Sequence, residues 1–233
     1  MTRDEIKRQI REVGLIPSIR VESADLAMFA AENVLAGGIP VVEIASTIPG
    51  ADQVVRDLTR RFPALIVGSE IGIPEVTPVA VSMVNREEVR RQLQAGAMFV
   101  TGPGFDAEVV RFCVEQEVVV LPGALTPTEV ILAYKAGADF VKVFPCSHVG
   151  GEQYIRALKA PLPHVPLIAA GGVTQSTAAQ FIAAGAAALG VGEDLIPSQA
   201  VRFREGAWIR ELASRFVTFV RQARSELRVR AAS

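Results

Sequence analysis

The sequence predicts an α/β fold: a single (β/α)8 TIM barrel with an extra N-terminal helix. The chain has 233 residues, half of them hydrophobic and 21% charged, so it is long enough to bury a full core. A short phrase built from Ala and Gly also recurs four times, and each copy closes an amphipathic stretch and precedes an apolar run. The four copies span residues 35–39, 94–98, 135–139 and 184–188. Each is typical of a helix stopped by a glycine and followed by a buried parallel strand.

The spacing of these phrases predicts the number of strands. Their glycines, Gly37, Gly96, Gly137 and Gly185, lie 59, 41 and 48 residues apart. Because one strand–helix unit takes roughly 20–30 residues, each interval has room for two units. Four pairs make eight units, which is the count of a TIM barrel.

The elements follow in order along the chain. Residues 4–13 are expected to form the extra helix, within an N-terminal segment of residues 1–14. Strands are expected over residues 15–19, 41–45, 99–101, 118–121, 140–144, 165–169 and 189–191. Thr126 to Glu129 form a capping box with proline at the first helical position. Apolar residues at helical spacing predict a closing helix over residues 208–219.

The pattern leaves the third strand open. Either residues 65–67 or residues 79–84 could form it, and residues 68–78 between them contain two prolines and two glycines, which predicts an inserted loop. No linker or change of composition divides the chain. Residues 1–233 are therefore expected to form one domain, with residues 227–233 as a flexible tail.

Charge and composition exclude several classes of partner. A net charge of −1 provides no basic field for nucleic acid or for an anionic membrane surface. The sequence shows no signal pattern, and its longest apolar run, residues 181–192, is too short to span a bilayer. The two cysteines, Cys113 and Cys146, have no metal or redox spacing and are expected to be packing residues in a cytoplasmic protein.

Lys142 stands in an apolar stretch, residues 138–145, and is one of only four lysines among 24 basic residues. Burial penalises the charged ammonium and so lowers the pKa of a buried lysine. A neutral amine attacks ketones, which makes Lys142 a candidate Schiff-base nucleophile. The alternative is a strand lysine whose ammonium reaches out to water. In a barrel, Lys142 falls on the sixth strand, near the carboxyl end, where active sites are built.

Glu43 is the matching charged residue, in the apolar run of the second strand. A lone strand glutamate would be read as a rim residue. Glu43 and Lys142, however, both occupy apolar sites of one barrel. We therefore predict that they are partners across its mouth.

The chain resembles the KDPG (2-keto-3-deoxy-6-phosphogluconate) aldolases and the related 4-hydroxy-2-oxoglutarate aldolases over nearly its whole length. The segments that carry the resemblance are residues 16–20, 37–44, 47–51, 103–104, 122–129, 141–145 and 171–173. Together, in this order, they are a specific signal. The resemblance implies a class I aldolase that assembles as a homotrimer, with no metal and no other cofactor.

The resemblance also implies roles for single residues. Lys142 would form an imine with the keto carbon of the substrate, and Glu43 would be the general acid and base. Arg20 and Thr47 match positions that contact the substrate's carboxylate, and a planar guanidinium suits a carboxylate well. Pro103 and Phe144 match positions in the pocket wall.

Two segments depart from the family pattern. The family usually carries Gly-Ala-Gly-Thr after the third strand, with the threonine on the pyruvyl carboxylate. Here residues 68–72 put Ile71 in its place, unless the other alignment holds and Ser82 supplies the hydroxyl. After the seventh strand Ala170 replaces a threonine, and after the eighth Glu193 replaces a serine that binds phosphate.

The backbone amides of Gly171, Gly172 and Gly192 could still hold an anion. A carboxylate at Glu193 would repel a phosphate by about 1–4 kcal/mol. Alternatively, Glu193 and Asp194 lie at a helix N-terminus and face solvent.

The expected function is reversible cleavage of a 2-keto-3-deoxy sugar acid, foremost 2-keto-3-deoxy-6-phosphogluconate, to pyruvate and glyceraldehyde 3-phosphate. One alternative is the same chemistry on an unphosphorylated or dicarboxylic acid such as 4-hydroxy-2-oxoglutarate. Another is a catalytically weak barrel that serves as a binding or assembly module.

Overall fold

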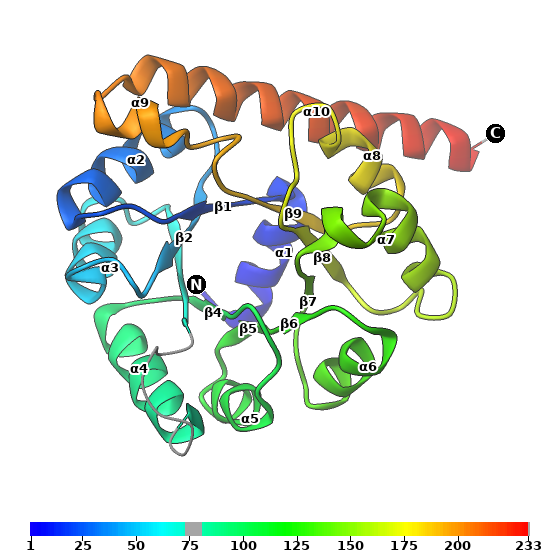
Figure 1. Cartoon of the computed structure of the whole chain (residues 1–233), viewed down its shortest axis with the longest axis horizontal. Coiled ribbons are helices and arrows are strands. Elements are labelled where there is room, and N and C mark those ends of the chain that lie inside the picture. The colour runs from blue at the N-terminus through cyan, green and yellow to red at the C-terminus, as the bar shows by residue number, and fades with distance from the viewer. Residues whose placement is uncertain (73–80, 233) are drawn as a thin grey trace.

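Nine parallel strands form one sheet that curls into a nearly closed barrel, with helices around the outside (Figure 1). The computed structural model describes residues 1–72 and 81–232, with side chains described except at 81–85 and 230–232. The sheet order is β5-β4-β3-β2-β1-β9-β8-β7-β6, so each strand pairs with a neighbour in the chain except where β1 meets β9. The prediction of a TIM barrel is confirmed.

The strands are short and buried. They are β1 (Leu15–Ile19), β2 (Val41–Ala45), β3 (Ile66–Glu70), β4 (Phe99–Thr101), β5 (Val119–Leu121), β6 (Gly123–Ala124), β7 (Val141–Val143), β8 (Leu167–Ala170) and β9 (Ala188–Val191). Pro122 separates β5 from β6, which together make the fifth strand of the barrel. Lys142 therefore lies on the sixth barrel strand, labelled β7.

Helices connect the strands and cover the outer face. They are α1 (Arg3–Val13), α2 (Ala24–Ala36), α3 (Ala51–Arg61), α4 (Val81–Ala95), α5 (Ala107–Glu115), α6 (Pro127–Lys135), α7 (Gly151–Lys159), α8 (Ala178–Ala183), α9 (Ser198–Arg202) and α10 (Gly206–Ala232), with a 3-10 turn at Cys146–Val149. The capping box of α6 is formed as predicted, since Thr126 and Glu129 each bond the other's backbone amide.

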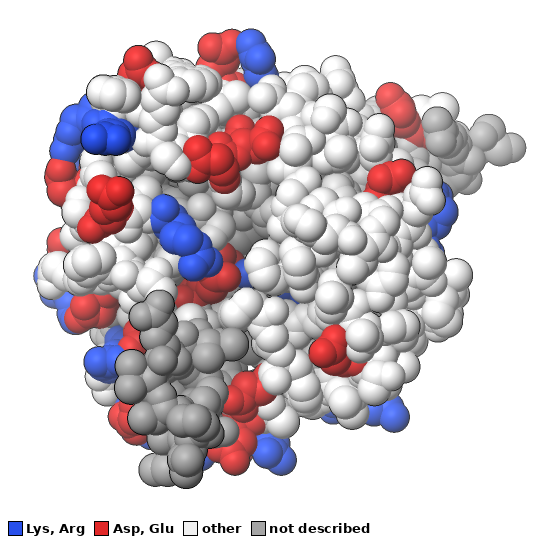
Figure 2. Space-filling view, viewed as in Figure 1, with Lys and Arg blue, Asp and Glu red and all other residues white. Residues whose placement is uncertain are grey.

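The extra helix α1 closes one end of the barrel. Thr2 and Glu5 form a capping box at its start, and its buried residues are Ile6 and Ile10. These two side chains pack with inward-facing residues of the strands, among them Val41 of β2 and Phe99 of β4. Because this end is filled with apolar side chains, a solvent-accessible site has to be built at the other end. The space-filling view shows a hollow at the centre of the molecule (Figure 2).

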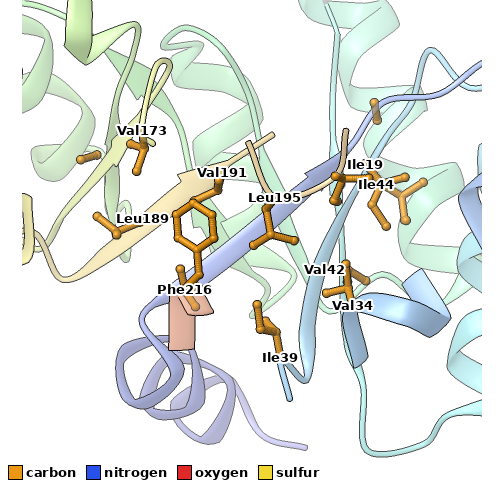
Figure 3. Close-up of a cluster of buried hydrophobic side chains, with 14 of the residues drawn as sticks. Ile19, Val34, Ile39, Val42, Ile44, Val173, Leu189, Val191, Leu195 and Phe216 are labelled. Carbon is orange, nitrogen blue, oxygen red and sulfur yellow. The ribbon is translucent and has the colours of Figure 1, made fainter. Parts of the chain in front are cut away.

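A second apolar layer lies between the barrel and its helices. Ile19 and Ile44 of neighbouring strands contribute to it, as do Val34 of α2 and Phe216 of α10 (Figure 3). Outward-facing strand residues thus anchor the helices, which leaves alternate residues of the same strands pointing into the barrel.

The structure settles the third strand and corrects two expectations. The strand is Ile66–Glu70, whereas residues 81–84 belong to helix α4. Residues 68–70, expected in a loop, extend β3 because each pairs with β4; Gly68 is tolerated there because the Phe99 ring fills the space of a side chain. Residues 73–78 of the expected loop lie outside the described residues. At the C-terminus, residues 227–232 continue helix α10 instead of forming a tail.

In the ranges 1–72 and 81–232, every helix falls short of the combined length and hydropathy that crossing a bilayer requires.

Candidate functional site

Four neighbouring strands, β1 to β4, bring polar residues of the site together. In the register of β1 and β2, Ser18 lies beside Glu43. In the registers of β3 with its two neighbours, Glu70 lies beside Ala45 and beside Thr101. Ser18, Glu43, Glu70 and Thr101 all line one cavity at the open end of the barrel. The two-residue period of the strands is what turns these side chains inward.

Lys142 reaches into this group from β7. Its Nζ lies 3.0 Å from Glu70 Oε1 and 3.7 Å from Glu43 Oε2. All three residues are buried, with Lys142 only 6% exposed. The ammonium also lies 5.8 Å from the centre of the Phe144 ring. Lys142 does not reach out to water, so the snorkelling alternative does not hold.

Glu43 is held by two hydroxyl groups. Ser18 Oγ donates to Oε1 at 2.8 Å, and Thr101 Oγ1 donates to Oε2 at 2.7 Å. Hydrogen bonds to an ionised carboxylate are short and strong, and here they fix the orientation of the group. Glu43 and Lys142 therefore face each other across the barrel, as the sequence predicts.

The charge state of Lys142 differs from the expectation. Burial lowers the pKa of the lysine, as expected, but the negative charges of Glu43 and Glu70 and the hydrogen bond to Glu70 together outweigh burial. The net result is a raised pKa, so Lys142 is an ammonium at neutral pH. The expected neutral amine is therefore wrong for the unliganded protein, because the charges of two carboxylates outweigh the burial on which that expectation rested.

Glu70 is the residue that the sequence analysis missed. Besides contacting Lys142, it forms an ion pair with Arg20 at the end of β1. With the third strand at residues 66–70, Glu70 falls on the second glycine of the family's Gly-Ala-Gly-Thr segment and Ile71 on the threonine. The alternative alignment, in which Ser82 supplies the hydroxyl, is wrong because residue 82 belongs to α4.

The cavity has a volume of about 580 Å³ and opens at the hollow seen in Figure 2. Every residue that the sequence analysis assigned to the site lines it. Besides Lys142 and Glu43 these are Arg20, Thr47, Pro103, Phe144, Gly171, Gly172 and Gly192. Ser18, Thr101 and Glu70 line it too but were not foreseen.

The far end of the cavity combines glycines with acidic residues. Gly171 and Gly172 have left-handed backbones, with φ of 81° and 83°. Glu193 and Asp194 are exposed and line the same cavity. Glu193 accepts hydrogen bonds from the amide and the hydroxyl of Ser198, where α9 begins. Its charge is thus fixed at the rim, close to the glycines that were expected to hold an anion.

Neither cysteine lines the cavity, although Cys146 Sγ contacts the carbonyl of Gly171 at 3.6 Å. Burial raises the pKa of Cys113 to about 12 and that of Cys146 to about 11. Both thiols are therefore protonated and unreactive at neutral pH. Among the residues that the structure describes, no cluster of three or more His, Cys, Asp or Glu side chains is arranged to hold a metal ion.

Comparison with known proteins gives one consistent family. Residues 6–212 match the family model described as KDPG and KHG aldolase. The chain is 32% identical over 215 residues to the 2-dehydro-3-deoxy-6-phosphogalactonate aldolase of Escherichia coli strain K12, covering 91% of this chain and 96% of that protein.

Two solved structures are also similar. One is described as a native KDPGal structure, with a TM-score of 0.77 and 31% identity, covering 91% of this chain and 96% of that one. The other is a cube-shaped protein cage designed by fusing symmetric oligomeric domains, with a TM-score of 0.81 and 30% identity, covering 95% and 77%. The chain therefore belongs to the KDPG and KHG aldolase family and is an aldolase, a carbon–carbon lyase.

Proposed function

We propose that the protein is a class I aldolase in which Lys142 forms an imine with the keto carbon of a 2-keto-3-deoxy sugar acid and releases pyruvate. The observation that carries this proposal is the position of Lys142, buried among carboxylates at the base of an open cavity. A buried, paired lysine that faces a cavity has no structural task that an apolar residue could not perform.

The chemistry follows from the neighbours of Lys142. The ammonium first gives up a proton, the neutral amine adds to C2 of the keto acid, and the carbinolamine takes up a proton and loses water to leave a protonated imine. Glu43 then takes the proton of the C4 hydroxyl while the C3–C4 bond breaks, and the bonding electrons flow into the imine to give an enamine and a free aldehyde. Protonation of C3 and hydrolysis of the imine release pyruvate and restore Lys142. Ser18 and Thr101 keep Glu43 oriented for this proton transfer from the C4 hydroxyl.

Arg20 and Thr47 are proposed to bind the carboxylate next to the keto group. Both line the cavity, and among the described residues of its lining Arg20 is the basic residue besides Lys142. A guanidinium can hold a carboxylate through two parallel hydrogen bonds. Pro103 and Phe144 are proposed to form part of the wall of the substrate pocket, and both line the cavity.

The tail of the substrate, the end far from the keto group, can carry a phosphate or be uncharged. The E. coli relative is named for a phosphorylated sugar acid, and the backbone of Gly171, Gly172 and Gly192 could bind a phosphate. The rim favours the other candidate, an unphosphorylated sugar acid with an uncharged tail. Glu193 and Asp194 place two negative charges there, and they would repel a phosphate or a second carboxylate alike.

The family resemblance further leads us to propose a homotrimer. It is supported by the similarity to a chain used in a cage made from symmetric oligomeric domains. Light scattering of the purified protein tests it directly. We also propose that the protein is cytoplasmic. The reducing conditions there suit the free thiols of Cys113 and Cys146.

Release of pyruvate from a 2-keto-3-deoxy sugar acid tests the proposed activity. The purified protein is given matched substrates with and without a terminal phosphate, and pyruvate is measured through a coupled dehydrogenase. We expect cleavage of both, with the unphosphorylated acid preferred. Absence of cleavage for a range of such acids, from a folded protein, would instead support a binding or assembly module.

A further inference from the structure

Glu70 holds two cations of the site at once. Its Oε1 accepts a hydrogen bond of 3.0 Å from Lys142 Nζ, and its Oε2 is bonded to Arg20. Glu70 and Lys142 are each 6% exposed, whereas the Arg20 side chain is 60% exposed, so the lysine end of the bridge is buried and the arginine end faces solvent. Glu43 is placed differently: its oxygens accept hydrogen bonds from Ser18 and Thr101, it lies 3.7 Å from Lys142 Nζ, and among the described residues its only ion pair is with that lysine. The bridge is therefore a feature of Glu70 alone.

The first consequence concerns Arg20. The proposed function assigns this guanidinium to the substrate's carboxylate, yet in the free protein it is paired with the carboxylate of Glu70. A keto acid must therefore compete with Glu70 for the same donor. Its carboxylate also arrives beside a buried negative charge, and two like charges at close range repel strongly in a site with little water.

The second consequence concerns Lys142. An ammonium cannot attack a ketone, and Glu70 is the closest group that stabilises the ammonium. Removing one of two carboxylates beside a lysine shifts its titration to lower pH. Glu70 therefore opposes imine formation in two ways. It occupies the guanidinium that would bind the substrate's carboxylate, and it stabilises the ammonium form of the amine that would attack the ketone.

The other charged side chains around Glu70 do not offset its unfavourable effect on an anionic substrate. Arg20 approaches from the end of β1, Glu43 from β2 and Lys142 from β7, while Glu193 and Asp194 stand at the rim after β9. Among the described residues that line the cavity there are thus four acidic and two basic side chains. An anionic substrate enters a pocket with an excess of negative charge.

We propose that Glu70 is a positioning residue that occupies Arg20 and holds Lys142 as the ammonium in the free enzyme. It thereby weakens the binding of the keto acid's carboxylate and moves imine formation to higher pH. This inference rests on the proposed Schiff-base function. It concerns a position where the family pattern has a glycine, so the basic chemistry does not require the Glu70 carboxylate.

The test is the substitution Glu70→Gln, which keeps the size of the side chain and removes its charge. Imine formation with pyruvate is measured by borohydride trapping and mass spectrometry, as a function of pyruvate concentration and of pH. We expect half-saturation at a pyruvate concentration about tenfold lower. We also expect the acid limb of the pH–rate profile to move down by about one unit or more.

Two further variants serve as a control for net charge and as a second substitution of Glu70. Glu22→Gln removes an exposed carboxylate that lies outside this cavity and controls for the change of net charge. Glu70→Gly introduces the residue of the family pattern and repeats the test if the glutamine variant does not fold, as judged by circular dichroism. Both substitutions of Glu70 should shift the profile in the same direction, and Glu22→Gln should leave it in place.

A thermodynamic cycle with Arg20 tests the shared guanidinium. Arg20→Ala should weaken pyruvate binding several-fold more in the Glu70→Gln background than in the wild type, because only there is Arg20 free to bind the substrate. The proposal is overturned if the pH profile and pyruvate affinity are unchanged, or if Glu70→Gln slows trapping tenfold or more at every pH, which would make Glu70 a required base. If the wild-type protein traps no pyruvate at all, the proposed function fails instead.

Discussion

Glu70 Oε1 accepts a hydrogen bond of 3.0 Å from Lys142 Nζ, inside a barrel where neither residue is more than 6% exposed. The nucleophile of the proposed reaction is thus stored as an ammonium between two carboxylates. This arrangement keeps a lysine in a buried position without leaving any of the three charges unpaired. It also determines how the protein should respond to substitution and to pH.

Replacing Lys142 by arginine should abolish aldol cleavage while leaving the protein folded. Arginine preserves the positive charge that Glu43 and Glu70 need, but a guanidinium does not form an imine. We expect turnover to fall by about 10³-fold or more. The measurement is pyruvate release, with circular dichroism to show that the fold is intact. Activity within tenfold of the wild type would contradict the role of Lys142.

The hydroxyl of Thr101 should matter for the orientation of Glu43. In Thr101→Val the carboxylate loses its 2.7 Å hydrogen bond while the shape of the site is kept. We expect the free energy of unfolding to fall by about 1–3 kcal/mol and turnover to fall about tenfold. Thr101→Ser restores the hydroxyl and is the matched control. Equal behaviour of the two variants in urea unfolding and in turnover would contradict this role.

Imine formation in the wild type should accelerate with pH. The pKa of Lys142 is raised by Glu43 and Glu70 despite burial, so only a small fraction of the amine is neutral at neutral pH. That fraction grows about tenfold with each pH unit until the raised pKa is reached. The measurement is the rate of borohydride trapping at low pyruvate concentration, from mildly acidic to mildly alkaline pH. A rate that is flat or falls over this range would contradict the assigned charge state.

The same raised pKa has a consequence for stability. A group whose pKa is raised in the folded state stabilises the fold at pH values below its unfolded pKa, here the ordinary value of 10.5, and loses this contribution as the pH rises further. The ion pairs of Lys142 therefore persist through neutral pH and weaken only under strongly alkaline conditions.

Removing the charge of Glu193 should favour phosphorylated substrates. In Glu193→Gln, the repulsion of about 1–4 kcal/mol toward a phosphate is lost. We expect the ratio of kcat/KM for the phosphorylated acid to that for the unphosphorylated acid to rise about five-fold or more. Glu211→Gln, on α10 away from the cavity, is the control. An unchanged ratio would mean that Glu193 takes no part in selecting the tail.

The repeated Ala-Gly phrase was sufficient to predict the barrel, because the fold repeats one unit and each unit leaves the same helix stop and apolar strand in the sequence. The pairing of Glu43 with Lys142 was predictable for a related reason. A charged residue inside an apolar strand stands out, and the barrel brings the carboxyl ends of all strands to one face.

Glu70 could not be found in this way. Its strand contains Gly68 and Ser69 and so has no continuous apolar run, and the glycines and prolines that follow resemble a loop. Once β3 is known to reach residue 70, the two-residue period places Glu70 inward. The charge of Lys142 was mispredicted for the same reason, since its pKa depends on a contact between residues 72 positions apart.

Covalent trapping of pyruvate tests the central claim most directly. The wild-type protein is incubated with pyruvate, reduced with borohydride, digested and analysed by mass spectrometry, with Lys142→Arg treated in parallel. The account predicts one reduced pyruvyl adduct on Lys142 in the wild type and none in the variant. A folded wild-type protein that forms no adduct, or carries it on another lysine, would contradict the account.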